Sequence, residues 1–206
     1  MNKFLIAAMS ATLAVASASA VASDANGAFF INAGVGQAQY HVGRTDGGFY
    51  KIDDKDTAGA LRFGYAWRAA DGFELGAEGG YADLGKSTAD LDYGPVAHTD
   101  EKLNAWLIGL NGKYHVAGKW YVQARGGWLR WEGKANARMF DPFTNTTSYG
   151  SAKGHGHGWY GGVGVGYDLG RNVSMGVAYD NYHVTGNHYG GALNIGTYMV
   201  SAELRF

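Results

Sequence analysis

Five charged side chains interrupt stretches that otherwise alternate between apolar and small residues: Arg62, Glu78, Lys113, Arg125 and Glu203. Ionised groups in a narrow, enclosed space are unstable unless they pair. A turn over residues 68–72 centred on Ala70 would place Arg62 opposite Glu78. Lys113 is a second candidate partner for Glu78. We predict a lumen charge cluster whose members satisfy one another, and the alternative is a set of ion pairs that opens a narrow pore.

Histidines form a second group of residues with chemical potential. His155 and His157 flank Gly156, so on a strand both imidazoles share one face, and His183 and His188 belong to the same end. Such a pair could bind a transition metal weakly. No cysteine or clear carboxylate completes a ligand set. We therefore predict no metal site, no catalytic residue and no cofactor.

The elements that must position these groups are strands, and the last ten residues show the pattern most clearly. In residues 197–206, Tyr198, Val200, Ala202, Leu204 and Phe206 share one face, and the residues between them are mainly polar. An apolar face towards lipid and a polar face towards a lumen would produce this alternation.

The same period recurs eight times in segments beginning near residues 28, 57, 73, 103, 120, 158, 173 and 197. The connections alternate in length. Residues 68–72, 115–119 and 168–171 are short turns, whereas 44–56, 85–101, 133–153 and 185–191 are polar loops, two of which contain Pro95 and Pro142. We predict an all-β, eight-stranded antiparallel up-and-down transmembrane β-barrel. The alternative is a secreted β-sandwich, which would not repeatedly present large apolar side chains to water.

Aromatic residues lie near the ends of the predicted strands. We expect an interface girdle on the short-turn side made by Trp67, Phe73, Trp120, Tyr167 and Phe206. Other aromatic residues fall in the long loops, where they could contact another surface or pack on the barrel rim: Tyr93, Phe140, Phe143, Tyr149 and Tyr189.

Composition and the first residues narrow the location. The 206-residue chain has no cysteine and a formal net charge of −1, which argues against disulfides, thiolate metal sites and nucleic-acid binding. Lys3, an apolar run over residues 4–16 and small residues at 18–22 predict a signal peptide, residues 1–22. Residues 23–206 are then the barrel, in the bacterial outer membrane.

Four stretches resemble the transmembrane domain of the outer membrane protein A (OmpA) family: residues 30–40 (FINAGVGQAQY), 77–86 (AEGGYADLGK), 112–131 (GKYHVAGKWYVQARGGWLRW) and the final Leu204, Arg205 and Phe206. The resemblance implies inward charges at Glu78, Lys113 and Arg125. The chain departs from the family at Gly166 and Gly176, where the family shows an inward Glu and Arg, and Glu203 is expected to replace part of that missing charge. No residues remain for the peptidoglycan-binding domain of many members, so the layout resembles barrel-only relatives, which include adhesion and serum-resistance proteins.

The resemblance implies a structural or surface-interaction, adhesin-like role with a lumen plugged by polar side chains. The expected partners are outer-membrane lipid and lipopolysaccharide, the barrel-assembly machinery through the C-terminal strand, and a host or cell-surface ligand at the long loops. A narrow ion-conducting pore is the alternative. A barrel-mouth lipid hydrolase is a third hypothesis, although residues 183–185 (HVT) do not match the His-Ser pair of the outer-membrane lipid A deacylases.

Overall fold

The computed structural model describes residues 27–41, 50–53, 55–92, 96–141, 146–186 and 191–206, so the predicted signal peptide lies outside the described residues. The strands are β1 (Gly27–His41), β2 (Tyr50–Asp53), β3 (Lys55–Ala70), β4 (Phe73–Asp92), β5 (Val96–Ala117), β6 (Trp120–Asp141), β7 (Thr146–Asp168), β8 (Val173–Gly186) and β9 (Gly191–Arg205). No helix in this part of the chain is long and apolar enough to cross a bilayer.

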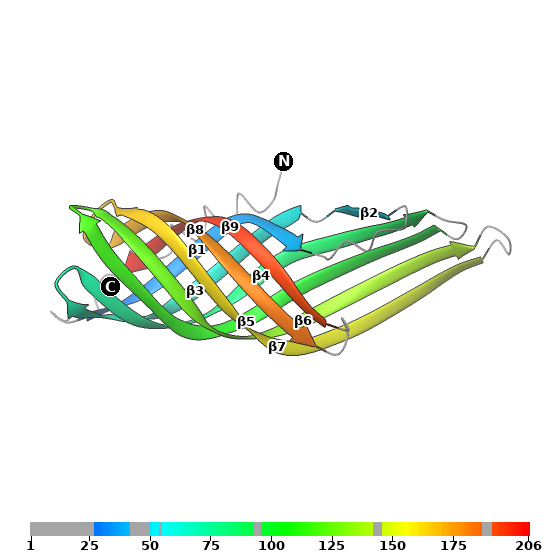
Figure 1. Ribbon diagram of the computed structural model, residues 1–206, viewed down its shortest axis with the longest axis horizontal. Coiled ribbons are helices and arrows are strands. Elements are labelled where there is room, and N and C mark those ends of the chain that lie inside the picture. Colours follow the sequence, from blue (N-terminus) through cyan, green and yellow to red (C-terminus); the bar gives the residue numbers. More distant parts are fainter. Residues whose placement is uncertain (1–26, 42–49, 54, 93–95, 142–145, 187–190) are drawn as a thin grey trace.

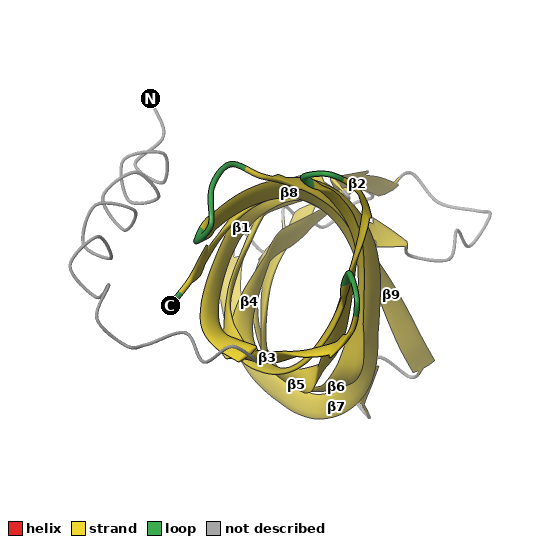
Figure 2. Cartoon of the chain, turned by 90° about the vertical axis from the view of Figure 1, so that its left-hand side faces the viewer, coloured by secondary structure: helices red, strands yellow, loops and turns green. Residues whose placement is uncertain are grey.

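Eight long strands form a closed ring, which Figure 2 shows nearly end on. Each strand from β3 to β9 pairs antiparallel with the next one, and β1 pairs with both β3 and β9. The pairing of β1 with β9 runs from Phe30 opposite Arg205 to His41 opposite Asn194, and it closes the ring. The prediction of an all-β, eight-stranded up-and-down barrel is therefore confirmed. The short β2 is an addition, because it falls in the predicted loop 44–56 and pairs with the outer end of β4.

The three predicted short turns are confirmed, and they gather at one end of the ring (Figure 1). The first turn takes its shape from Gly72, whose φ of 71° is a left-handed conformation that favours glycine. Gly118 does the same in the second turn with a φ of 56°. The opposite end of the ring carries the longer excursions.

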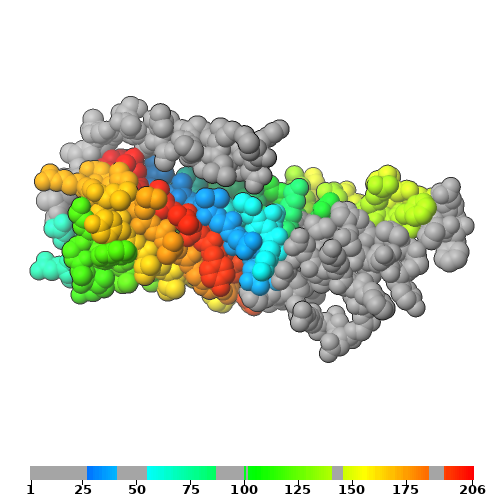
Figure 3. Space-filling model, turned by 90° about the horizontal axis from the view of Figure 1, so that it is seen from above, coloured from blue at the N-terminus to red at the C-terminus, as the bar shows by residue number. Residues whose placement is uncertain are grey.

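Two of the predicted long loops, 85–101 and 133–153, are mostly strand instead. β4 runs on to Asp92, β5 begins at Val96, β6 continues to Asp141 and β7 begins at Thr146. These extensions form one four-stranded sheet beyond the ring (Figure 1), here called the tongue: residues 86–92, 96–102, 134–141 and 146–153. Its outer part projects past the ring in the space-filling view (Figure 3). One face of the tongue is mostly polar and the other mainly small, so the large apolar side chains that mark the lipid-facing side of the barrel strands are largely missing. Pro95 and Pro142 lie outside the described residues.

The two faces of the ring differ sharply along every long strand. Large apolar side chains project outward, among them Phe63, Trp106, Leu110, Trp128 and Val163. Inside, the charged groups gather towards the short turns, and a cluster of apolar side chains fills the ring towards the tongue. An outward apolar band of this kind is stable in lipid and not in water.

Leu110 lies midway along β5 between the outward rings of Trp106 and Tyr114, and it is 56% exposed. We expect Leu110→Arg to lower the free energy of unfolding by about 2–4 kcal/mol, because the charge would lie at the centre of the apolar band. Val116→Arg, near the short turn of the same strand, should cost about 0–1 kcal/mol. Urea unfolding in phospholipid vesicles measures both, and equal losses would contradict a lipid-facing band.

Candidate functional site in the barrel lumen

The five predicted lumen charges all lie on the inner face of the ring. Arg62, Glu78, Lys113 and Glu203 are buried, and the side chain of Arg125 is 6% exposed. The structure adds Asp180 of β8 at the centre, and Glu74 and Arg205 on the short-turn side. The lumen cluster therefore contains four carboxylates and four cations, and it is neutral overall.

Asp180 holds two arginines at once and has no exposed side-chain surface. Arg125 donates from Nε to Oδ1 at 2.7 Å and from Nη2 to Oδ2 at 2.9 Å, a bidentate pair. Arg62 donates from Nη2 to Oδ2 at 3.1 Å and to the Tyr182 hydroxyl at 2.8 Å. The sequence reasoning did not single out Asp180. The signal was present, because Asp180 follows the outward Tyr179 and must point inward.

The predicted register of Arg62 and Glu78 is wrong by two residues. The turn sits at Asp71 and Gly72 rather than at Ala70, so Arg62 lies opposite Gly80 and Glu78 opposite Gly64. The two charges still approach, with 3.9 Å between Arg62 Nε and Glu78 Oε1. That distance is an ion pair without a hydrogen bond, so Asp180 is the main anionic partner of Arg62.

Glu78 was a candidate partner for Lys113, but the structure pairs Lys113 with Glu203 of β9. Its Nζ lies 2.7 Å from Glu203 Oε1 and 4.1 Å from the centre of the Tyr121 ring. Arg205 Nε donates to the same Glu203 oxygen at 2.9 Å, and Arg205 Nη1 lies 2.6 Å from Glu74 Oε2. The lumen cluster thus divides into a group around Asp180 and a group around Glu203.

Glu78 is held mainly by neutral donors. Tyr160 Oη donates to Oε1 at 2.8 Å, and Asn111 Nδ2 donates to Oε2 at 2.9 Å. Tyr160 reaches Glu78 across Gly109 of β5, which lies opposite Gly127 of β6. A Cβ on Gly109 would collide with the Tyr160 hydroxyl. The glycines of the lumen therefore make room for the large polar side chains.

A cavity of about 20 Å³ remains between the two groups, with Asn32, Arg62 and Gln123 in its wall. It is large enough for about one water molecule. Asn32 Oδ1, Arg62 Nε and Gln123 Nε2 lack hydrogen-bond partners among the described residues. A single bridging water is the chemistry that this space supports.

The interior on the tongue side of the lumen cluster is apolar rather than polar, which corrects the expectation of a polar interior throughout. The buried side chains there include Tyr40, Leu84, Leu103, Leu129, Trp131, Val184 and Ile195. Their polar atoms are satisfied by the backbone: Trp131 Nε1 donates to Thr185 O at 3.0 Å and Tyr40 Oη to Leu84 O at 2.9 Å. Two layers of different chemistry therefore fill the ring.

Residues 8–206 match the model of the family described as the outer membrane protein beta-barrel domain. The chain belongs to this family. No curated protein matches it. Among solved structures it is similar to Ail, the attachment invasion locus protein of Yersinia pestis, with 14% identity over 87% of this chain and 99% of that chain and a TM-score of 0.47. It is also similar to Neisserial surface protein A, with 10% identity over 86% of this chain and 97% of that chain and a TM-score of 0.42. A third similar structure is the outer membrane protease OmpT from Escherichia coli, with 10% identity over 88% of this chain and 96% of that chain and a TM-score of 0.45.

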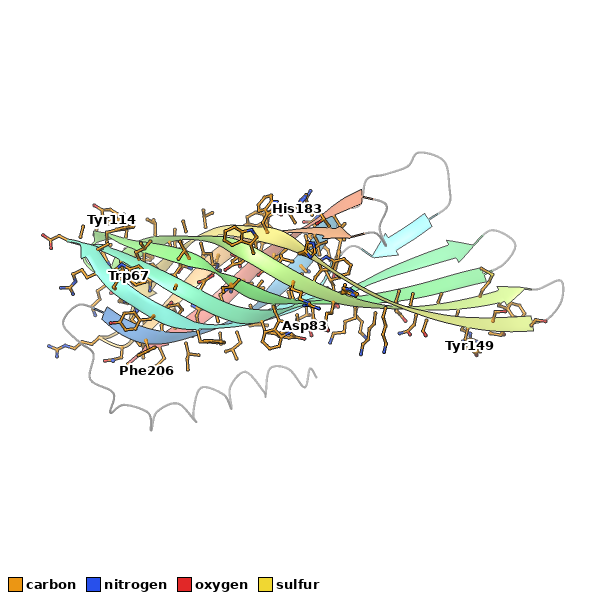
Figure 4. The ribbon with its side chains drawn as sticks, turned by 90° about the horizontal axis from the view of Figure 1, so that it is seen from below. Trp67, Asp83, Tyr114, Tyr149, His183 and Phe206 are labelled. Carbon is orange, nitrogen blue, oxygen red and sulfur yellow. The ribbon has the colours of Figure 1, made fainter. Side chains whose placement is uncertain are left out.

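This outer-membrane barrel lies in the bacterial outer membrane, and its outward band faces lipid. The structure places the five predicted girdle residues at the short-turn end, where Trp120 packs on Tyr167 with 5.1 Å between ring centres, and Phe206 on Phe29 with 6.3 Å. Trp67 and Phe206 are labelled at this end in Figure 4. A second set towards the tongue, here called the outer girdle, consists of Tyr81, Trp106, Trp128 and Trp159.

The histidines on the tongue side of the outer-membrane barrel, His155, His157 and His183, point away from its lumen. His155 and His157 are exposed on β7, opposite Glu132 and Arg130. His183 stacks on Trp159 and contacts Asn194 Oδ1 at 2.7 Å through Nδ1. In the part of the chain that the structure describes, no three His, Cys, Asp or Glu residues form a group that could hold a metal. His188, Tyr93, Phe143 and Tyr189 lie outside that part.

Asp180→Asn should destabilise the barrel strongly, because it leaves Arg62 and Arg125 buried without their shared counter-charge. We expect the free energy of unfolding in phospholipid vesicles to fall by about 3–5 kcal/mol. Asp83→Asn is the matched control, because it breaks a surface ion pair in which the side chain of Lys102 is 46% exposed and that of Asp83 is 38% exposed. This variant should lower the free energy of unfolding by less than about 1 kcal/mol. Similar losses for both variants would show that the lumen cluster contributes no more than a surface pair.

Proposed function

We propose that this outer-membrane barrel is a non-catalytic surface protein that makes adhesin-like contacts through the tongue, while its filled lumen does not conduct ions. The observation that carries the proposal is the tongue itself. Four strands continue past the outer girdle as one hydrogen-bonded sheet, up to Asp141 opposite Thr146. A barrel with only an anchoring role needs no such extension.

One edge of the tongue supports contact with a partner. The pairing of β7 with β8 ends at His157 opposite Thr185, so residues 146–156 of β7 have no neighbouring strand on that side among the described residues. The opposite edge is covered by β2. An unpaired edge presents a row of N–H and C=O groups to which an extended segment of another protein can add as a strand.

Exposed side chains near that edge would add contact area. Tyr149 is 76% exposed, and the Arg138 guanidinium lies 5.9 Å from the centre of its ring. Met139, on the opposite face of β6, is also exposed. Aromatic, Arg and Met side chains are enriched in protein interfaces. Phe140, another of the predicted contact residues, is only half-buried.

The two layers inside the ring support a closed lumen. An eight-stranded barrel is only wide enough for side chains to fill its interior. Here a charged layer leaves space for about one water molecule, and an apolar layer with Trp131 at its centre lies beside it. The narrow pore remains the second candidate function, because the ion pairs around Asp180 and Glu203 could exchange partners.

The remaining partners follow from location and topology. We infer contact with outer-membrane lipid and lipopolysaccharide along the outward band, and recognition of β9 by the barrel-assembly machinery. β9 is the last strand to close the ring, and Phe206 and Phe29 exchange two backbone hydrogen bonds of 3.0 Å. Residues 1–22 are proposed as the signal peptide that directs export.

Shortening the tongue should abolish adhesion and leave the barrel folded. The change removes residues 138–149 and joins Ala137 to Gly150, which face each other across β6 and β7. Bacteria that display this variant should lose binding to an epithelial cell monolayer, because the outer part of the unpaired edge and Tyr149 are gone. Unboiled gel migration should still show a folded barrel. Wild-type binding by the shortened variant would contradict the proposal.

Conductance decides between the closed lumen and the pore. We expect purified barrel in planar bilayers to show no current above leak, since the charged layer leaves a space of about 20 Å³ and the layer beside it is filled by buried apolar side chains. Steps of current in the wild type that vanish in Glu78→Ala or Lys113→Ala would support the pore instead. A porin inserted in the same bilayers is the positive control.

A further inference from the structure

Four lysines lie directly opposite one another where the ring passes into the tongue. Lys86 of β4 faces Lys102 of β5, Lys102 faces Lys134 of β6, and Lys134 faces Lys153 of β7. All four are exposed on the outward face, the same face as the outer girdle. Neighbouring strands are about 4.8 Å apart, so this lysine ladder is a row of cations about 15 Å long.

A β-bulge sets this alignment. The register of β4 against β5 shifts by one residue between Asp83 and Lys86, at Gly85, whose φ is 84°. Without that shift, Lys102 would face Gly85. The bulge is held by two hydrogen bonds, from Gly85 N to Asp83 Oδ1 at 3.1 Å and from Lys86 N to Asp56 Oδ2 at 2.6 Å.

The lysine ladder carries more positive charge than its surroundings neutralise. Like charges directly opposite each other on a sheet are destabilising. Lys102 lies 2.9 Å from Asp83, and this hydrogen bond raises the pKa of Lys102. Among the described residues Lys86, Lys134 and Lys153 form no ion pair. The next outward row towards the girdle contains Asp83, Glu132 and His155, the row after it Arg130 and His157, and the adjacent row on the tongue side Asp100. With Asp56, which accepts the hydrogen bond from Lys86 N, four carboxylates therefore face the four lysines and Arg130.

The height of the ladder matches that of lipid head groups. Lys102 is four residues beyond Trp106, and Lys134 is six beyond Trp128, on strands that rise about 3.3 Å per residue. With a tilt of about 40°, the two lysines lie roughly 10 and 15 Å outside the outer girdle along the membrane normal. Lysine stems can extend back towards the interface, so the ammonium groups reach the zone just outside the acyl chains.

We propose that the lysine ladder binds the phosphate groups of the outer-leaflet glycolipid, the lipid A part of lipopolysaccharide. Compact ammonium groups on long, flexible stems suit phosphate groups near the membrane surface. This site deepens the contact with lipopolysaccharide included in the proposed function, and it is independent of adhesion by the tongue. The shortened tongue that lacks residues 138–149 keeps all four lysines.

Native mass spectrometry of the detergent-solubilised barrel, titrated with bisphosphorylated lipid A, tests the site. The ladder variant carries Lys86→Gln, Lys134→Gln and Lys153→Gln. The matched control removes three exposed cations at the opposite end by Arg68→Gln, Lys119→Gln and Arg171→Gln. At about fivefold per lysine near a membrane surface, we expect about 100-fold weaker binding by the ladder variant and unchanged binding by the control. Replacement of the same three lysines by arginine should restore binding to within a few fold.

Three further ligands establish what the site recognises. The wild type should bind lipid A that lacks phosphates as weakly as the ladder variant binds bisphosphorylated lipid A. Pyrophosphate or heparin alone, at micromolar concentration, should not bind the wild type. Unboiled gel migration checks that each variant is folded. Equal binding of lipid A by wild type and ladder variant, equal binding of the dephosphorylated lipid, or tight ladder-dependent binding of pyrophosphate or heparin would each overturn the proposal.

Discussion

Closure of the ring by β1 and β9 is the constraint on which the rest of this structure depends. Lipid offers no hydrogen bonds, so every backbone N–H and C=O within the apolar band must pair with another strand. The ladder from Phe30 opposite Arg205 to His41 opposite Asn194 meets that requirement at the last seam. Closure also fixes which face of each strand is inside, and it limits the interior to a width that side chains must fill.

The side chains that fill the lumen account for the two inward positions at which this chain differs from the outer membrane protein A family. Gly166 and Gly176 stand where that family shows an inward Glu and Arg; the Tyr121 ring lies over Gly166 and its hydroxyl lies near Gly176. Tyr121 also packs against the Lys113 ammonium, whose anionic partner is Glu203. A neutral aromatic side chain and a lysine–glutamate pair from other strands thus occupy the space of the missing ion pair.

The sequence predicted the barrel and the inside–outside assignment because hydrophobic alternation is a direct consequence of one face in lipid and one in a lumen. Charges at Arg62, Glu78, Lys113, Arg125 and Glu203 could be placed inside on that ground alone. Their pairing could not, since partners such as Arg62 and Asp180 are 118 residues apart in the chain. A turn at Gly72 instead of Ala70 was enough to shift the expected register by two residues.

The tongue was predicted as loops for a related reason. A sheet with water on both faces has no apolar period, so polar residues such as those in 133–141 read as loop. What holds the tongue in register is the barrel beneath it. The pairing of β6 with β7 continues without a shift from Trp120 opposite Tyr167 to Asp141 opposite Thr146.

The partner of each tongue residue is therefore set by the register of the barrel strands beneath it. Lys102, Lys134 and Lys153 are aligned by that long-range register, and Lys86 joins them through the one-residue bulge at Gly85. A bulge bends its strand and increases the local twist, and this one lies where the ring ends and the tongue begins. The same extra residue that redirects β4 out of the ring thus also completes the row of cations above the outer girdle.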